Sequence, residues 1–502
     1  MKQIVWGGYG ILCWLYQDVR QNTAVYIDGT RILDNGTRDE LRAKYPDAEV
    51  FGSDDLFLMP AFVNAHDHGR CIGSLSLGVP DTFLESWLPL LALQPALPKD
   101  VAAAYEGIQL LKSGVTATAH SHNPNAWATL AEESHQTIAG YRRVGMRVAY
   151  HPTTIDQNRL IYAERAAFLA ALPTDLEAVA RGMMGDGAPY PVDDYFALCE
   201  SLYQQYHDAD GCTVHVQVSP AGGQWCSDDL ILRCAAFAES HRTRIQMHML
   251  ETRYQQIYAQ KTWGKSFIRH LDEIGVLSER LTLAHMVYAE DADFELLSQH
   301  RVGIAHNPSS NLRLRSGIAP LAKLYYQDDI ALGVGLDGQS LDEDQDYWRE
   351  LRLALSLGAQ AGMTAADLDA HHLLQLGSSG STRVTFGSEA QLGQLYHHHL
   401  ADLVLLDWKT AIGFWTPDVN YAVSFPEILL RRANRSHVRH VMAHGEWVIR
   451  DGQATKTDEA ALEAELREAL ARVDRAVLRE RAAQIQRLLP YVRQFYAVWE
   501  RL

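Results

Sequence analysis

Two histidines separated by one residue, His66 and His68, follow the apolar run Leu56–Val63. On a β-strand, residues two positions apart project to the same side. Two neutral imidazoles side by side at a strand end form half of a site for a borderline-soft divalent ion such as zinc. A single His-x-His is weak evidence, so a functional site requires further ligands from elsewhere in the chain.

Matching groups follow in order, each at the end of a later apolar run. They are His248 with Glu251, then His285, then Asp337. Three imidazoles and one carboxylate leave a coordination position for water, as catalytic zinc sites do. Glu251 is close to His248 in sequence and can therefore act beside it as a general acid or base. Together these pieces predict a catalytic metal site.

The elements that position these groups alternate between apolar strands and helices from Leu58 onward, which is the pattern of parallel β/α units. Eight strand candidates end near His66, His120, His151, Ser219, Met249, His285, His306 and Asp337. Helices are expected between them, for example over 98–113, 228–241 and 291–300. Eight such units predict an α/β fold, a (β/α)₈ TIM-like barrel, in which functional side chains lie at the C-terminal strand ends.

Both ends of the chain read as β structure. Short strand-like segments cover 3–14, 23–33 and 48–51, and further ones follow at 401–407 and 438–450. We therefore expect a small β-sandwich domain formed by 1–57 together with 378–456, around a barrel of 58–377. Residues 457–502 are expected to form a packed or interface helical segment, because their heptads are too irregular for a coiled coil.

Composition excludes several classes of protein. The 502 residues carry 45 basic and 62 acidic side chains, a net charge of -17, so no basic face for nucleic acid is expected. Six scattered cysteines without a Cys-x-x-Cys pair indicate reduced core thiols. No apolar run approaches the roughly 20 residues of a membrane helix. We expect a cytoplasmic enzyme with no membrane partner, and a homo-oligomer, with a homodimer as the expected form.

Several motifs together resemble the amidohydrolase superfamily, specifically its mononuclear aminohydrolase branch. That branch includes cytosine, guanine and adenosylhomocysteine deaminases and the triazine hydrolases. The similarity extends over nearly the whole chain, to about Gln453. The matching stretches are 59–68, 248–251, 283–285, 305–312 with 316–320, 335–338 and 401–404.

The resemblance implies roles for these residues. One divalent ion, zinc or alternatively ferrous iron, would be held by His66, His68, His248 and Asp337. Glu251 would shuttle protons, and His285 would position the attacking hydroxide. Asp337 would also help to hold the water and take its proton. No lysine ends a middle strand, which removes the usual bridging ligand of two-metal relatives.

Substrate recognition is open to several interpretations. Ala221 stands where adenosylhomocysteine-type deaminases carry a substrate-binding histidine, which favours a compact flat heterocycle over an adenosyl compound. Trp87 and Trp225 follow strands 1 and 4 and could stack on such a ring or belong to the core. His122, in a second His-x-His, could line the pocket or be structural. The long stretch 156–210 is either a lid or a surface insertion.

Four acids after Asp337 also have two interpretations. Asp342, Glu343, Asp344 and Asp346 could begin a helix, where the dipole favours negative charge, or face a cationic substrate near the mouth of the site. If they lie near the mouth, they would also disfavour phosphates.

Three functions remain after these considerations. The first is a metal-dependent aminohydrolase that releases ammonia from a small aminated N-heterocycle. The second keeps the fold and metal but displaces chloride, an alkylamine or a lactam nitrogen. The third is a catalytically inactive scaffold on the same fold, which the retention of all four ligands and Glu251 disfavours.

Overall fold

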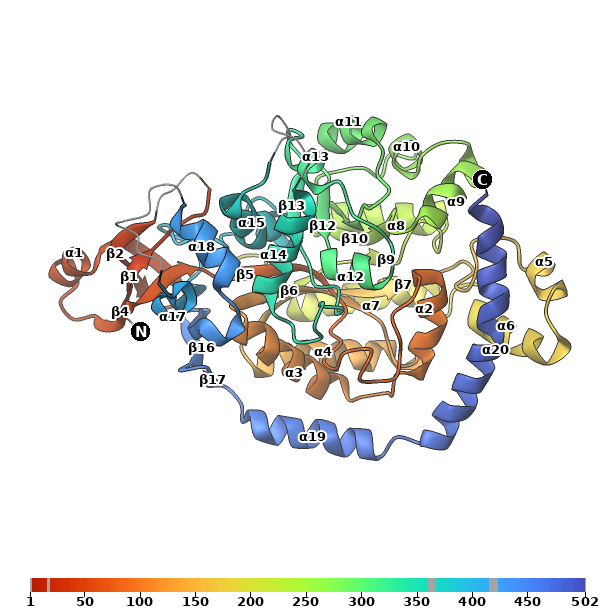
Figure 1. Ribbon diagram of the computed structural model, residues 1–502, viewed down its shortest axis with the longest axis horizontal. Helices are drawn as coiled ribbons and strands as arrows, with labels where there is room; N and C mark the ends of the chain where they lie inside the picture. The colour runs from red at the N-terminus through yellow and green to blue at the C-terminus, as the bar shows by residue number, and fades with distance from the viewer. Residues whose placement is uncertain (1, 16–18, 360–366, 415–422, 502) are drawn as a thin grey trace.

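The computed structural model describes residues 2–15, 19–359, 367–414 and 423–501. A β-sheet built from both chain ends lies at one side, next to a larger α/β body (Figure 1). Helix α19 runs along the edge of that body, and α20 turns up its far side. Within these residues, no helix has the length and apolar character needed to cross a membrane.

The sheet from the chain ends has eight strands in the order β17-β16-β15-β14-β4-β1-β2-β3. Strand β4 joins the two ends, because it pairs in parallel with β1 and antiparallel with β14. The sequence patterns located these strands, but the strand expected over 48–51 is longer in the structure, where β4 spans Glu49–Pro60. The strands are β1 Lys2–Gly10, β2 Arg20–Asp28, β3 Arg31–Thr37, β4 Glu49–Pro60, β14 Leu403–Asp407, β15 Val438–Ala443, β16 Glu446–Arg450 and β17 Gln453–Ala454.

The expectation of a β-sandwich stays a prediction, since the hydrogen-bonded strands of both ends form one continuous sheet. The proposed domain boundaries also stay predictions. The expected boundary between 377 and 378 falls inside the π-helix η3 (Leu376–Gly380), and α16 (Ser381–Phe386) lies in the stretch assigned to the β domain. Both elements pack against β13 and β5 of the α/β body.

The larger body contains a five-stranded parallel sheet, β5-β6-β7-β8 with β9 paired to β7, and a four-stranded parallel sheet, β10-β11-β12-β13. Parallel bridges at Val218–Ile245 and Gly222–His248 join the two sheets on one side. On the other side, the amide of Asp337 donates to the carbonyl of His66. The strands are β5 Phe62–Asp67, β6 Val115–His122, β7 Arg147–Thr154, β8 Val214–Val216, β9 Ser219–Pro220, β10 Ile245–Met249, β11 Leu281–His285, β12 Gly303–His306 and β13 Ala331–Val334.

Helices separate most of these strands, as the sequence predicts. Helix α8 starts at the N-cap Ser227, whose hydroxyl accepts from the amide of Leu230, and two aspartates in its first turn favour the same end. The helices up to β10 are α1 Arg38–Lys44, α2 Leu84–Leu90, α3 Lys99–Lys112, α4 Leu130–Arg143, α5 Arg165–Ala170, α6 Thr174–Met184, α7 Val192–Tyr206 and α8 Asp228–Ser240, with 3₁₀ turns η1 Leu91–Leu93 and η2 Trp127–Thr129.

The later helices cover the second half of the body and the C-terminal region. They are α9 Arg253–Trp263, α10 Phe267–Glu273, α11 Asp291–Gln299, α12 Pro308–Arg313, α13 Leu321–Tyr325, α14 Tyr347–Gly358, α15 Ala370–Gln375, α17 Trp408–Ile412, α18 Phe425–Arg432, α19 Glu459–Ala471 and α20 Arg475–Trp499, with the 3₁₀ turn η4 Arg435–His437. The predicted helices over 98–113, 228–241 and 291–300 are therefore confirmed as α3, α8 and α11.

A buried ion pair connects the barrel strands to the sheet of the chain ends. The Nε and Nη2 atoms of Arg147 on β7 donate to the two carboxylate oxygens of Asp402 at 2.9 and 2.8 Å. Both side chains are almost fully inaccessible to solvent. Asp402 also accepts from the amide of His444. This bidentate contact explains why an aspartate precedes β14 in the Ala-Asp-Leu-Val stretch.

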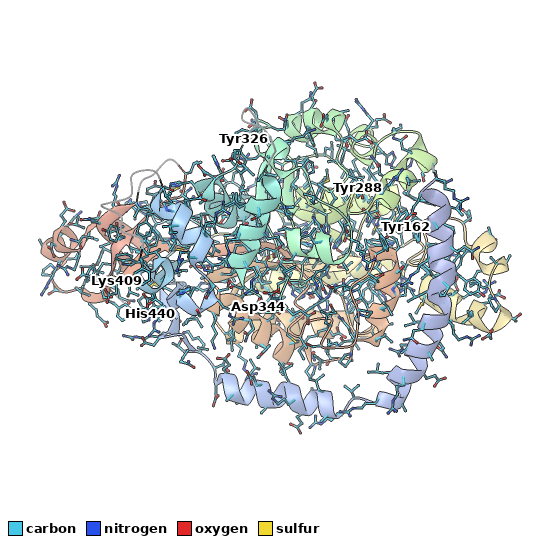
Figure 2. The ribbon with its side chains drawn as sticks, viewed as in Figure 1. Tyr162, Tyr288, Tyr326, Asp344, Lys409 and His440 are labelled. Atoms are coloured by element: carbon cyan, nitrogen blue, oxygen red, sulfur yellow. The ribbon has the colours of Figure 1, made fainter. Side chains whose placement is uncertain are left out.

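The C-terminal helices pack on the body through one apolar face. In α20 this face includes Ile485, Leu488, Val492 and Tyr496, all buried. The Tyr496 hydroxyl accepts from the amide of Tyr162, which lies beside α20 in Figure 2. Tyr162 belongs to the long connection after β7, so the insertion and the C-terminal helix support each other.

Candidate metal centre and active site

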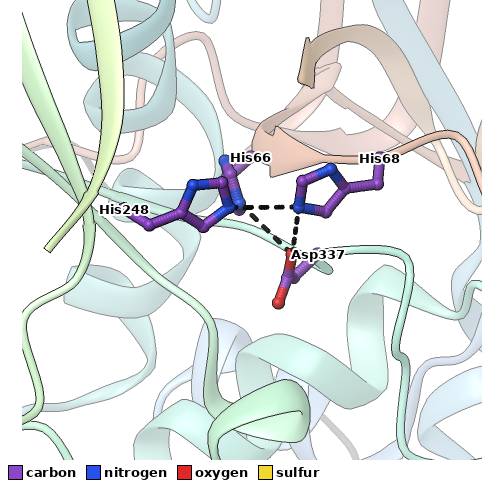
Figure 3. Close-up of side chains that lie close together, drawn as sticks. All are labelled: His66, His68, His248 and Asp337. Carbon is purple, nitrogen blue, oxygen red and sulfur yellow. Dashed lines mark hydrogen bonds and ion pairs between the residues drawn. The ribbon is translucent and has the colours of Figure 1, made fainter. Parts of the chain in front are cut away.

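Four side chains from three parts of the barrel converge at one point (Figure 3). His66 and His68 come from the end of β5, His248 comes from β10, and Asp337 follows β13. Each offers one ligand atom, and these atoms all lie within 4.8 Å of one another. The Nε2 atoms of His66 and His68 are 3.2 and 3.1 Å from Oδ1 of Asp337. The four residues predicted as metal ligands are therefore brought together.

Hydrogen bonds on the outer ring nitrogens orient all three imidazoles. Nδ1 of His68 lies 2.9 Å from the carbonyl oxygen of Ser121, and Nδ1 of His248 lies 2.6 Å from that of Ala221. Because a carbonyl only accepts, each Nδ1 carries the proton and each Nε2 presents its lone pair inward. Such outer partners fix ligand orientation in metal sites.

Burial favours the uncharged form of His68 and His248 and so prepares these two ligands for metal binding. It lowers the pKa of His68 to about 4 and that of His248 well below its usual value. Burial alone would raise the pKa of Asp337, but the imidazoles of His66 and His68 hold it well below its ordinary range. The centre thus offers neutral nitrogens on His68 and His248 and one carboxylate. At His66 burial lowers the pKa, but the adjacent Asp337 carboxylate outweighs this effect and the net pKa is raised.

Unpaired imidazole nitrogens at the centre also indicate that the donor set fits a divalent ion. Nε2 of His66 is buried and makes no hydrogen bond among the described residues, and the nearby Oδ1 of Asp337, at 3.2 Å, is an acceptor that has no proton to donate to its lone pair. Nε2 of His68 and Nε2 of His248 are 3.1 Å apart, although both nitrogens carry lone pairs. A cation at the convergence point satisfies these nitrogens and removes their mutual repulsion.

The two other predicted catalytic groups lie beside this centre. Nε2 of His285 is 3.8 Å from Oε2 of Glu251 and 4.0 Å from Oδ2 of Asp337. Burial raises the pKa of Glu251 well above its usual value, and the nearby carboxylates of Asp337 and Glu85 raise it further. A carboxyl group that holds its proton more tightly is suited to exchange protons near neutral pH.

The sequence motif of 305–312 supplies partners to which no role was assigned from the sequence. Oδ1 of Asn311 lies 2.9 Å from Nδ1 of His285, and the hydroxyl of Ser310 donates to Oδ2 of Asp337 at 2.5 Å. Asn311 and Ser310 both lie on α12, which follows β12. The motif therefore positions a neighbouring histidine and the carboxylate ligand, a function that its residue types alone do not indicate.

The backbone at the site adopts the left-handed conformation at three non-glycine residues. The φ angles are 49° at Leu250, 79° at His285 and 57° at Asp337. This region is costly for residues with a Cβ atom, and it persists only where surrounding contacts enforce it. The turns directly after β10, β11 and β13 are therefore held in place to aim Glu251, His285 and Asp337.

A cavity of about 900 Å³ opens over the metal centre. His68, His248, Glu251, His285 and Asp337 line its floor, and the predicted substrate contacts Trp87 and Trp225 line its walls. His122 does not line it. Its Nε2 instead lies 3.6 Å from Oε2 of Glu133, and the neighbouring His120 faces the cavity.

The outer part of the cavity is formed by segments outside the strand ends. Ile155, Arg159 and Met183 from the long connection after β7 line it, as do Val473 and Val477 from the α19–α20 region. The long connection thus borders the cavity, and its movement as a lid stays a prediction.

The acids after Asp337 have structural partners. Asp346 caps α14 by accepting from the amide of Trp348. Asp342 and Asp344 pair with Arg349, at 2.5 and 2.7 Å, and Asp344 is visible in Figure 2. Glu343 pairs with Arg313 at 2.8 Å. The helix-start interpretation is confirmed for Asp346. None of the four acids lines the cavity, and their position near its mouth stays a prediction.

Comparisons with known proteins agree with this geometry. The model of the amidohydrolase family matches residues 57–448. A 5-methylthioadenosine/S-adenosylhomocysteine deaminase of Thermodesulfovibrio yellowstonii is 27% identical over 457 residues, which cover 89% of this chain and 92% of that protein. A 5'-deoxyadenosine deaminase of Methanopyrus kandleri is 25% identical, with 91% and 96% covered.

Solved structures share the fold. An adenosine deaminase from Xanthomonas campestris with bound zinc superposes with a TM-score of 0.76 at 23% identity, covering 94% of this chain and 98% of that one. An atrazine chlorohydrolase from Arthrobacter aurescens, complexed with zinc, gives 0.77 at 19% identity, covering 93% and 99%. With its metal-binding cluster and a family match over most of its length, the chain belongs to the amidohydrolase family and is a hydrolase of carbon–nitrogen bonds other than peptide bonds.

Proposed function

We propose that the protein is a metal-dependent deaminase that releases ammonia from a small aminated N-heterocycle. The observation that carries the proposal is the convergence of the His66, His68, His248 and Asp337 ligand atoms beside Glu251 and His285. All of these residues except His66 line the floor of one cavity. Zinc is the proposed ion, with ferrous iron as the alternative. Zinc-bearing solved structures of the same fold support this choice.

An ion bound there supplies Lewis acidity that makes hydroxide available at neutral pH. The remaining chemistry belongs to the protein. Oδ2 of Asp337, fixed by Ser310, accepts a proton from the attacking water. His285, held by Asn311, directs the oxygen toward the ring carbon. The buried Glu251 protonates the ring nitrogen, regains a proton from the hydroxyl group added to the ring carbon, and delivers that proton to the departing ammonia. Asp337 then returns the proton that it took from water to Glu251, which restores both groups.

The proposed substrate is a compact flat heterocycle, held between Trp87 and Trp225. Ala221 supports this choice, because it lines the cavity with no polar group at the position where adenosyl deaminases carry a histidine. A second candidate is an adenosine derivative, favoured by the names of the curated relatives. Displacement of chloride or an alkylamine is the third, favoured by the fold match to the atrazine chlorohydrolase.

One screen separates these candidates. The zinc-loaded protein is incubated with purines, pyrimidines, pteridines, triazines, adenosine and methylthioadenosine, and ammonia, chloride and alkylamine are assayed separately. We expect ammonia, with the highest kcat/KM for a free base or pteridine. Higher kcat/KM for the adenosine compounds would overturn the substrate class, and release of chloride or alkylamine without ammonia would overturn the deaminase assignment.

A further inference from the structure

An arginine stands next to the metal centre and belongs to no role described so far. Arg70 follows the ligand His68 by two residues and lines the cavity. A Cβ added at Gly338 would lie 3.2 Å from both Cβ and Cγ of Arg70, so the stem of Arg70 packs against the turn that follows Asp337. Its position is therefore fixed by the same turn that aims the carboxylate ligand.

The guanidinium of Arg70 rests on an aromatic face. Its central carbon lies 4.7 Å from the centroid of the Trp87 ring. Stacking on tryptophan holds a guanidinium flat without using its N–H groups. The result is a planar group at the cavity wall whose hydrogen-bond donors remain available.

Arg70 makes no hydrogen bond or ion pair within the part of the chain that the structure describes. The buried arginines Arg147 and Arg313 behave differently from the half-buried Arg70, since Arg147 is paired with Asp402 and Arg313 with Asp81 and Glu343. Asp67, the nearest acid in sequence, accepts instead from Asn64 and from the amides of His68 and Gly69. The five N–H donors of this charged group thus have no acceptor among the described protein residues.

Three other hydrogen-bond donors in the cavity wall also lack acceptors among the described residues. Nε1 of Trp87, Nε1 of Trp225 and Nε2 of Gln94 are buried and have no hydrogen-bond partner in the described ranges of the chain, and all three residues line the cavity. Buried donors that stay unpaired cost free energy, so sites of this kind are completed by a ligand or by water. The cavity wall above the metal centre therefore presents hydrogen-bond donors, which suits a ligand that carries hydrogen-bond acceptors.

We propose that Arg70 is a substrate-binding residue that donates hydrogen bonds to an oxygen carried on or beside the heterocycle, either a ring carbonyl or a carboxylate. The substrate class is thereby an oxygen-bearing aminated heterocycle, and ring systems without such an oxygen, including the adenine ring, are poor substrates. This inference rests on the proposed deaminase function. A rival role is purely electrostatic, because the carboxylates of Asp337, Asp67 and Glu251 lie close enough to interact with the Arg70 charge.

Matched compounds separate the two roles. One set consists of 4-aminopyrimidine, cytosine, which adds a ring carbonyl, and 4-aminopyrimidine-5-carboxylate, while guanine and 2-aminopurine form a second pair. For at least one pair, we expect wild-type kcat/KM to favour the oxygen-bearing member by about 100-fold or more, as sites built to bond a polar group do. The R70Q variant should reduce this preference to less than about tenfold, and R70K should recover part of it.

The variant R181Q is the control, because Arg181 on α6 is exposed, pairs with Glu177 and does not line the cavity. It should retain the wild-type preference and zinc content. An electrostatic role predicts that R70Q lowers kcat/KM equally for both members of each pair. That outcome, or a wild-type enzyme without any preference, overturns the proposal.

Equilibrium binding distinguishes this proposal from the deaminase function. The same compounds are titrated calorimetrically into the zinc-loaded E251Q enzyme and into the E251Q/R70Q double variant. The role of Arg70 is supported if E251Q binds the oxygen-bearing compounds at least about tenfold more tightly than their oxygen-free counterparts and E251Q/R70Q does not. This holds even if no compound releases ammonia. Ammonia release together with equal binding by the two variants retains the deaminase and refutes the role of Arg70.

Discussion

Oε1 of Gln246 lies 2.7 Å from Nδ1 of His66, and Nε2 of the same amide donates to the carbonyl of Ala65 at 2.9 Å. The second bond fixes the amide orientation, so its oxygen accepts from a protonated Nδ1 of His66. Nε2 of His66 is thereby kept as a lone-pair donor. Gln246 lies on β10, two residues before His248, and orients a ligand on a different strand.

The variant Q246L should bind zinc about 10- to 100-fold more weakly, because loss of an outer partner lets the ligand ring rotate or change its tautomer. Q246E keeps an acceptor and should lose less affinity. Competition with a chromophoric chelator measures both variants. Equal zinc affinity in wild type and Q246L would show that His66 is oriented by other contacts.

One metal ion per chain is expected after gentle dialysis. The middle strand β9 begins at Ser219, where a two-metal site would need a bridging lysine. Elemental analysis should give a ratio near one, and H66A should lose the metal, since only three of the four ligands then remain. Reproducible binding of two ions, both required for turnover, contradicts this assignment.

Glu251→Gln should keep the fold and the metal but reduce kcat by at least about 100-fold, as expected when a general acid/base is removed. Steady-state ammonia release and zinc content measure the two effects on one preparation. H66A serves as the contrast, because it should lose metal and activity together. Near wild-type turnover by E251Q would exclude Glu251 as the proton carrier.

Glu85 should make stability depend on pH. Burial raises the pKa of this carboxyl from 4.5 to about 7, although Thr252 and Tyr162 donate to it. The folded state therefore binds the proton more tightly than the unfolded state. The resulting stabilisation is complete below pH 4.5 and is lost as the pH rises through 7, a change of about 3 kcal/mol.

The variant E85Q replaces this titrating group with a neutral amide of the same shape. The free energy of unfolding of E85Q minus that of wild type should increase by up to about 3 kcal/mol between pH 4.5 and pH 8. Urea titration of the two zinc-loaded proteins measures this difference. A difference that does not change with pH would mean that Glu85 is ionised in the folded protein.

Asp402→Asn should destabilise the protein by about 3–5 kcal/mol, because it leaves the buried guanidinium of Arg147 without a counter-charge. The double variant R147M/D402L should cost less, since an apolar pair leaves no charge uncompensated. Thermal and chemical unfolding measure both. If the double variant is as unstable as D402N, packing at this position matters more than charge.

The strand ends could be predicted from the sequence because each functional residue follows an apolar run. His66, His120, His285 and His306 lie in the last residues of β5, β6, β11 and β12. The partners Gln246 and Asn311 could not be predicted, because their roles depend on which side chains meet across neighbouring strands. His122 illustrates the same limit. The sequence does not indicate which histidine of the second His-x-His lines the cavity, and in the structure it is His120.

The pairing of β4 with β14 has a consequence for how the chain folds. Pro60 and Leu403 are register partners, so nearly the entire barrel is synthesised between the two strands. Until β14 emerges from the ribosome, β4 has one unpaired edge, which can pair with other chains. Such distant pairing slows folding and exposes intermediates to aggregation. Refolding should therefore be slow and concentration-sensitive, and expression should benefit from chaperones that bind nascent chains.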